Sequence, residues 1–204
     1  MMRVGLISNP LSQRNRQHQP AMRNAAADHP GLLHAELDSV LGGRRPSVGD
    51  FAKLVYLRQV LDETMRLYPP LPIMMFRTAI AADVVCGRRI PRRSIVGIFP
   101  WVVHRHRKLW RDADQFDPDR FAPAEATARS RYAYLPFAAG PHVCVGASMA
   151  MLQLIVAVAV LAQRFRFRLV PGRPVEPTAW TNIRPRRGMW MTVEPRTAAS
   201  TRAA

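Results

Sequence analysis

The stretch from Pro136 to Gly146 reads PFAAGPHVCVG, and a long apolar segment, ASMAMLQLIVAVAVLAQRF, follows it directly. Gly140 and Gly146 permit an unusual backbone path around Cys144 and leave room for a flat partner to approach. A helix that starts after this loop directs its unpaired backbone N–H groups toward the Cys144 sulfur, where they stabilise a thiolate. The sequence therefore places one cysteine between a glycine-bracketed loop and the start of an apolar helix.

Three roles are open to such a cysteine: nucleophile, metal ligand or plain structure. A nucleophile needs a neighbouring base, and His142 is near in sequence, but side chains two residues apart do not generally face each other. A single cysteine cannot complete a closed zinc site, which needs four protein ligands. It can be the one axial ligand of a haem.

The composition narrows the class of protein. The chain has 204 residues, 48% of them hydrophobic, with 30 basic and 14 acidic residues. Only Lys53 and Lys108 are lysines, so a coding bias toward Arg and Ala explains the charge better than a nucleic-acid surface; a basic docking face is the alternative. Two cysteines make no disulfide framework, which fits a reducing compartment. The N-terminus has no apolar run long enough for a signal peptide, so we expect a cytoplasmic protein.

Periodicity predicts helices over residues 29–43 and 54–68, because leucines recur there at helical spacing and Gly-Gly or Pro-Pro pairs end each run. Residues 73–100 hold short apolar runs cut by turn residues, which is typical of short strands, and two more strands are expected near the end. Cys86, inside the first of these runs, is expected to be a small buried side chain. Residues 1–28 are polar without a period, and we expect a poorly ordered arm there and one domain from 29 to 204.

Glu63 and Arg66 lie three residues apart on a predicted helix and away from its leucine stripe. Periodicity alone therefore favours a solvated pair worth about 0.2–0.5 kcal/mol.

The apolar segment at residues 145–162 is at the lower length limit for a membrane span, at about 18 residues. Gly146, Ser148 and Gln153 interrupt it, so we favour a buried core helix and expect no membrane span.

The loop resembles the haem-binding signature of the cytochrome P450 family, Phe-x-x-Gly-x-Arg-x-Cys-x-Gly. Phe137, Gly140, Cys144 and Gly146 match, and His142 stands where arginine is commonest. The resemblance implies that Cys144 is the axial ligand of haem iron and that the other four shape the cofactor site.

Two more segments resemble the same family, in the family's order. ETMR, followed by LYPP, is similar to its Glu-x-x-Arg helix, and FDPDRF, residues 116–121, is similar to its Pro-x-Arg-Phe loop, with Asp119 where Glu is common. The resemblance implies that Glu63, Arg66 and Arg120 form a buried triad behind the haem. Because two arginines would share one carboxylate, backbone carbonyls must supply further acceptors.

The family likeness covers about residues 29–194 and implies a mainly α fold with small β-sheets, the C-terminal haem-binding part of a cytochrome P450. It implies haem b as cofactor, with Arg77 and His142 toward the haem propionates; an exposed strand arginine is the alternative for Arg77. His104 is read as a structural residue. The implied reaction is monooxygenation of a small apolar substrate, with electrons from a ferredoxin, flavodoxin or reductase.

The chain differs from the family in its length and in its first residues, and these differences limit the activity that the resemblance implies. Family members are much longer, and Met1–Asp28 does not resemble the oxygen-activating helix that precedes the Glu-x-x-Arg helix. We therefore expect a truncated haem-thiolate protein, and no catalytic residue can be identified in this chain. The alternative is a non-catalytic remnant that binds haem weakly or not at all.

Overall fold

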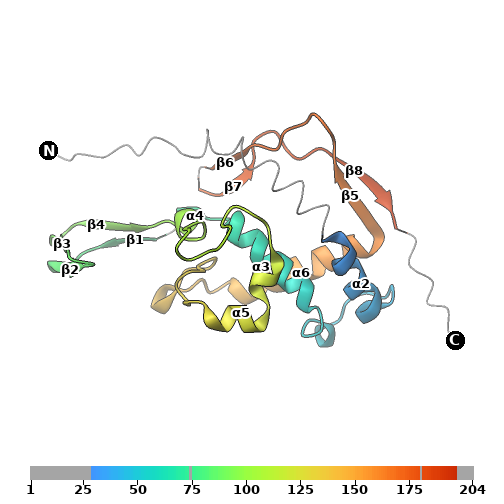
Figure 1. Ribbon diagram of the computed structural model, residues 1–204, viewed down its shortest axis with the longest axis horizontal. Coiled ribbons are helices and arrows are strands. Elements are labelled where there is room, and N and C mark those ends of the chain that lie inside the picture. The colour runs from blue at the N-terminus through green and yellow to red at the C-terminus, as the bar shows by residue number, and fades with distance from the viewer. Residues whose placement is uncertain (1–28, 74, 180, 197–204) are drawn as a thin grey trace.

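The structure, a computed structural model, describes residues 29–73, 75–179 and 181–196. The arm expected at Met1–Asp28 lies outside these ranges. Figure 1 shows a helical body from which the four short strands of residues 75–98 extend as an arm. The strand pair of residues 165–169 and 191–195 lies toward the opposite end, and the pair of residues 177–179 and 183–185 lies above the body in this view. Helices and small two-stranded antiparallel sheets thus make up the fold, which confirms the mainly α class with small sheets.

Three helices form the body: α2 (Pro30–Leu41), α3 (Val55–Leu67) and α6 (Ala147–Arg164). They enclose the main core, to which α2 contributes Leu37 and Leu41 and α6 contributes Ile155. The helices predicted over 29–43 and 54–68 are confirmed. Gly42 and Gly43, both with positive φ, end α2 in the left-handed conformation that favours glycine.

The start of α3 is capped by a side chain from another helix. Its N-cap residue is Leu54, whose side chain cannot accept a hydrogen bond. Glu36 on α2 accepts instead, from the backbone N–H of Tyr56 (2.6 Å) and of Leu57 (2.8 Å). The carboxylate satisfies two unpaired N–H groups and complements the positive end of the helix dipole, so α2 and α3 are joined by a polar contact as well as by their core.

Helix α6 buries one stripe and exposes the rest. Met151, Ile155, Ala159 and Ala162 recur at helical spacing and are buried, whereas Met149, Leu152 and Leu161 are exposed. The expected burial of this segment is therefore only partly met. Within the described ranges α6 is long and apolar enough to cross a membrane, a test that the core helix of a soluble protein also passes.

The far end of α6 is closed by Arg196. Its guanidinium donates to the carbonyls of Ala162 (3.0 Å) and Gln163 (3.3 Å), which have no partner inside the helix. It also forms an ion pair with Asp38 on α2 at 2.8 Å. This contact fastens the last strand to both helices.

The arm consists of two ribbons. Strand β1 (Met75–Thr78) pairs antiparallel with β4 (Ile95–Ile98), and β2 (Asp83–Val85) pairs with β3 (Arg88–Ile90). These are the short strands expected in residues 73–100. The prediction for Cys86 is wrong: it is exposed, with a φ of 48°, in the turn between β2 and β3. Cys86 and Gly87, whose φ is 72°, both have the positive φ of a type I′ hairpin turn, so Cys86 lies at the exposed tip of the hairpin.

The two late strands expected from the sequence are β5 (Phe165–Leu169) and β8 (Met191–Pro195), and they pair with each other antiparallel. A second pair, β6 (Pro177–Ala179) and β7 (Ile183–Pro185), was not expected. Short helices α4 (Pro100–Val103) and α5 (Pro123–Ala128) flank the 3₁₀ turn η2 (Pro118–Phe121). A second 3₁₀ turn, η3 (Gly140–His142), precedes α6, and a third, η1 (Val48–Asp50), precedes α3. Around η2 a second, smaller core gathers Trp110, Ala113, Ala133, Phe121 and Tyr134.

The turn at Cys86 generates a test. Asn adopts positive φ more readily than Cys, so Cys86→Asn is expected to stabilise the β2–β3 hairpin by about 0.5–1 kcal/mol. The β-branched substitution Cys86→Val should destabilise it, because that side chain tolerates positive φ poorly. Hydrogen exchange of the hairpin amides measures both effects. Similar exchange rates in the two variants would contradict the turn geometry.

Candidate functional site

The loop that carries Cys144 is held by its own backbone. The N–H of Cys144 donates to the carbonyl of Phe137 at 2.9 Å, and the N–H of Val143 donates to the carbonyl of Gly140 at 3.1 Å. Ala138 and Gly140 both have positive φ, of 65° and 73°. The chain therefore folds back on itself between Phe137 and Cys144, and the turn depends on a glycine at position 140.

This fold presents the Cys144 thiol at the start of α6. The thiol is free and exposed, and its sulfur lies 3.8 Å from the point where a Cβ on Gly146 would be. No side chain caps the N-terminus of α6, and Ala147, its first residue, donates back to the Cys144 carbonyl at 3.2 Å. The sulfur thus lies at the positive end of an 18-residue helix.

The surroundings of the thiol fit a single-ligand, flat, apolar cofactor. Within the part of the chain that the structure describes, no group of three or more His, Cys, Asp or Glu residues could hold a metal ion. Val143 and Val145 on either side of Cys144 are exposed, Val145 completely. An exposed thiol between apolar side chains, beside a glycine with open space around it, is the donor set that a haem would take.

His142 and Arg77, the two residues expected near the haem propionates, are both exposed. His142 belongs to the loop that carries Cys144, residues 137–146, called the ligand loop below. Arg77 lies on β1 in the arm, where its guanidinium donates to the carbonyl of its neighbour Phe76 at 2.8 Å. Among the described residues no hydrogen bond or ion pair joins Arg77 to the loop, and neither side chain pairs with an acidic residue. Both therefore stay available to an anionic ligand group.

Glu63 and Arg66 are completely buried. Two parallel hydrogen bonds join them, from Arg66 Nε to Glu63 Oε2 at 2.6 Å and from Nη2 to Oε1 at 2.8 Å. The remaining Arg66 donors reach the backbone carbonyls of His104 (2.8 Å), Ala113 (2.7 Å) and Gln115 (2.9 Å). All five N–H groups of the guanidinium are thus satisfied. The solvated pair that periodicity favoured is not what the structure contains.

Arg120 completes the group at a greater distance. Its Nε lies 3.6 Å from Glu63 Oε1 and 3.6 Å from Asp117 Oδ2, which makes ion pairs without a hydrogen bond. Its two Nη atoms donate to the carbonyls of Arg111 and, at 3.1 Å, Asp112. The structure therefore brings Glu63, Arg66 and Arg120 together, and backbone carbonyls supply the acceptors that the charge count required.

Burial raises the pKa of Glu63, and the hydrogen bonds from Arg66 and from the N–H of Asp117 (2.8 Å) oppose that shift. The charge of Arg120 acts in the same direction as these hydrogen bonds. The carboxylate is thus kept ionised by its partners rather than by water, and removing those partners would favour its protonated form.

His104 has a larger role than the sequence indicated. Its ring is completely buried; Nδ1 lies 3.2 Å from the carbonyl of Arg66, and Nε2 accepts the N–H of Leu135 at 2.7 Å. Burial lowers its pKa to about 4, so the ring is neutral near pH 7. Because Nε2 accepts, the single ring proton is on Nδ1, which donates it to the backbone carbonyl of Arg66. The only signal in the sequence was its place beside Arg105 in a His-Arg pair.

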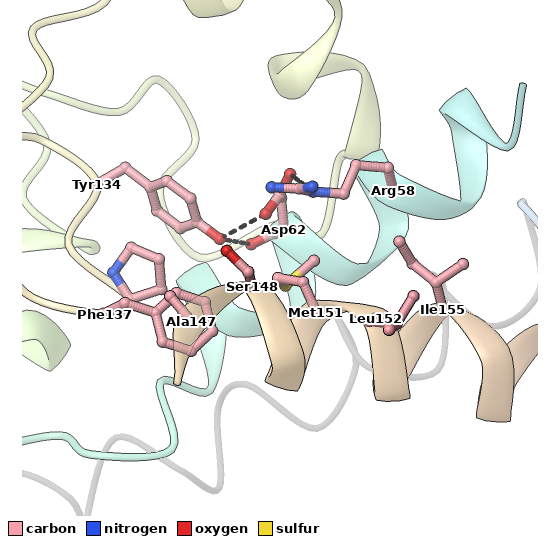
Figure 2. A pocket seen from close by; sticks show the side chains of 10 residues that line it. Arg58, Asp62, Tyr134, Phe137, Ala147, Ser148, Met151, Leu152 and Ile155 are labelled. Atoms are coloured by element: carbon pink, nitrogen blue, oxygen red, sulfur yellow. Dashed lines mark hydrogen bonds and ion pairs between the residues drawn. The ribbon is translucent and has the colours of Figure 1, made fainter. Parts of the chain in front are cut away.

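A cavity of about 380 Å³ lies between α3 and the first turns of α6 (Figure 2). Tyr134, Asp62 and Arg58 form its polar side, and Phe137, Met151 and Ile155 form its apolar side. A larger groove of about 1120 Å³, lined mainly by apolar side chains, runs between the three main helices and strands β5–β8. Cys144 lines neither hollow, so the thiol faces outward from the described chain.

Comparisons with known proteins agree on one family. A family model described as Cytochrome P450 matches residues 28–191. Cyclooctatin synthase from Streptomyces melanosporofaciens is 40% identical over 173 residues, which cover 85% of this chain and 35% of that protein. Cyclooctat-9-en-7-ol 5-monooxygenase from the same organism is 38% identical over 140 residues, or 69% of this chain and 30% of that protein. The chain spans about a third of the length of these curated relatives.

Solved structures give the same result. A cyanobacterial cytochrome P450 with bound retinoic acid is similar with a TM-score of 0.78 and 25% identity, over 89% of this chain and 42% of that chain. A zebrafish cytochrome P450 with abiraterone has a TM-score of 0.71 and 31% identity, over 89% and 43%. The arrangement of helices and small sheets in this chain is therefore one found in larger haem-protein folds.

The buried pair generates a test of stability. Glu63→Ala leaves a buried guanidinium without its carboxylate, so the free energy of unfolding should fall by about 3–5 kcal/mol. Glu194→Ala is the matched control, because it breaks a pair with Arg168 (3.3 Å) in which both side chains are largely exposed. That change should cost less than about 1 kcal/mol. Urea unfolding followed by circular dichroism measures both, and equal losses would show that burial does not set the strength of the Glu63 pair.

Proposed function

The chain belongs to the cytochrome P450 family, and from that premise we propose that it is the haem-binding part of a haem-thiolate monooxygenase. The cofactor proposed is haem b, with Cys144 as the axial ligand of its iron. Residues 29–204 would form this haem-binding part. The placement of the thiol carries the proposal: exposed, between apolar neighbours, at the start of α6.

Five other residues of the chain have proposed roles in holding the cofactor, among them Gly146 beside the Cys144 sulfur. Arg77 and His142 would bind the two carboxylates of the haem, because both are exposed and lack an acidic partner among the described residues. Phe137 fixes the loop, since its ring packs on the main core while its carbonyl accepts the Cys144 N–H. Gly140 leaves open space where any side chain would project. Glu63, Arg66 and Arg120 support the loop from behind without reaching the ligand.

A haem with an axial thiolate supplies an electron-rich iron that favours cleavage of the O–O bond of dioxygen. The N-terminus of α6 would stabilise the negative charge on the Cys144 sulfur, through the helix dipole and its uncapped N–H groups. The proposed substrate is a small apolar molecule. Two of the relatives are named cyclooctatin synthase and cyclooctat-9-en-7-ol 5-monooxygenase.

The proposed partner is an electron-donor protein, of the ferredoxin, flavodoxin or reductase kind. The net charge of +16 supports an acidic partner, because complementary charge speeds the encounter of two proteins. We further propose a cytoplasmic location, which the free thiols support.

Haem ligation gives the direct test. The reduced protein under carbon monoxide should show the red-shifted Soret band of a thiolate-bound haem. Cys144→Ala should abolish that band because it removes the ligand. Cys86→Ala is the matched control and should retain the band, since Cys86 lies in the arm. Loss of the band in Cys86→Ala alone would overturn the ligand assignment. No band in the unmodified chain would favour the non-catalytic alternative.

Oxygen insertion is a separate question. In the family resemblance, the acid–alcohol pair that delivers protons to oxygen belongs to a helix ahead of Glu63, and Met1–Asp28 contains no match for it. We therefore expect no coupled product from the 204 residues by themselves, even with a competent reductase and excess reductant. The measurement is the incorporation of labelled dioxygen into a panel of apolar substrates. Label in an organic product over many turnovers, absent in Cys144→Ala, would contradict this expectation.

A further inference from the structure

The segment that leads into the ligand loop, residues 133–137, is held by side chains from two distant parts of the chain. The N–H of Leu135 donates to His104 Nε2 at 2.7 Å. One residue earlier, the Tyr134 hydroxyl donates to the side chain and the backbone carbonyl of Asp62 on α3, both at 3.0 Å (Figure 2). Two consecutive residues are therefore fixed, one through its backbone and one through its ring.

The same segment sets the position of Cys144. Phe137 follows Leu135 by two residues, and its carbonyl accepts the Cys144 N–H at 2.9 Å. The Phe137 ring packs on the main core, so it cannot shift without disturbing α3 and α6. A displacement of residues 134–137 would therefore move the hydrogen bond that anchors the cysteine.

The His104 ring connects this segment to the buried Arg66 (Figure 2 shows the neighbouring Tyr134 and Asp62). Its Nδ1 side bonds to the Arg66 carbonyl, and Arg66 Nη1 donates in return to the His104 carbonyl at 2.8 Å. The rings of His104 and Tyr134 also contact each other, with centroids 5.3 Å apart. The route from the buried ion pair to the cysteine is thus continuous: Arg66, His104, Leu135, Phe137 and Cys144.

We infer that His104 and Tyr134 are positioning residues for the Cys144 thiolate, acting through residues 134–137 without touching the cofactor. The inference rests on the proposed role of Cys144 as the haem ligand, but the anchoring of the Cys144 amide can be measured without haem. A merely structural role would lower overall stability and leave the ligand loop unchanged at equal stability.

Paired substitutions at His104 separate the two bonds of its ring. His104→Gln keeps an acceptor near the position of Nε2, so the Leu135 N–H stays bonded. His104→Asn keeps a donor near the position of Nδ1 and leaves the Leu135 N–H without a partner. Tyr134→Phe keeps the ring and removes the hydroxyl. Asp38→Asn is the control, because it breaks a partly buried ion pair with Arg196 at the other end of α6.

Hydrogen exchange of the haem-free chain is the first measurement. The Cys144 and Leu135 amides should exchange about tenfold faster in His104→Asn than in Asp38→Asn at matched stability, because a specific hydrogen bond is lost or loosened. Tyr134→Phe should accelerate the Cys144 amide, and His104→Gln should leave it near the unmodified rate. If His104→Asn does not fold, the Tyr134→Phe and His104→Gln variants still decide the outcome. Equal Cys144 exchange in all variants would overturn the inference.

The Soret band of the reduced carbon monoxide complex is the second measurement. His104→Asn and Tyr134→Phe should convert part of the red-shifted, thiolate-bound population to the unshifted form, while Asp38→Asn and His104→Gln should not. A full thiolate band in every variant would also overturn the inference. If the unmodified chain lacks the band, the proposed function fails, and the exchange rates alone then decide whether His104 and Tyr134 anchor residue 144.

Discussion

The described fold is organised around one buried guanidinium. Arg66 has no exposed surface. Two of its five N–H groups donate to the carboxylate of Glu63 on its own helix, and the other three donate to backbone carbonyls between residues 104 and 115. A buried charge without these partners would cost several kcal/mol, so the irregular segment after α4 has to adopt the path that delivers its carbonyls. That segment has little regular hydrogen bonding of its own. Hydrogen bonds from the Arg66 guanidinium thus hold the backbone of residues 104–115 in place, as hydrogen bonds between strands hold a strand in a sheet.

The same constraint extends to the ligand loop and explains why the site is built from irregular backbone. Both the backbone carbonyl and the ring of His104 are hydrogen-bonded to Arg66. The same ring accepts the N–H of Leu135, so Leu135 is fixed relative to Arg66. The loop beyond Leu135 must turn twice through positive φ before it reaches Cys144. Such a path stores unfavourable local conformations, which persist only where the surroundings determine them. A buried, fully satisfied polar network provides such surroundings, because any shift would leave one of its members unpaired.

Sequence patterns predicted the regular parts of this fold and not the polar interior. Leucine spacing and flanking Gly or Pro pairs place α2 and α3 within a residue or two, because apolar burial and helix breakers act locally. The same periodicity predicts that Glu63 and Arg66 are exposed to solvent, because helical spacing carries no information on the carbonyls of residues 104–115 that accept from Arg66. Only the family resemblance predicted that the pair is buried. The apolar pattern also put Cys86 in a core, although the next residue is a glycine and the pair forms a two-residue turn. For His104 the sequence offered only its place beside Arg105 in a His-Arg pair, which does not show that the ring is buried and accepts the Leu135 N–H.

Two buried charges and several exposed apolar side chains depart from the usual distribution of polar and apolar residues. Glu63 and Arg66 are completely buried, whereas Val145 and Ile80 are almost wholly exposed. In the proposed function, the bound cofactor would cover the exposed valines beside Cys144. A flat apolar ring system would do so while taking the thiolate as its ligand. Because such a ligand binds only the folded loop, it would add its binding free energy to the stability of the fold. In the proposed function, Glu63 and Arg66 would thus hold the Cys144 thiol in position, and the exposed valines beside it would add apolar contacts with the cofactor.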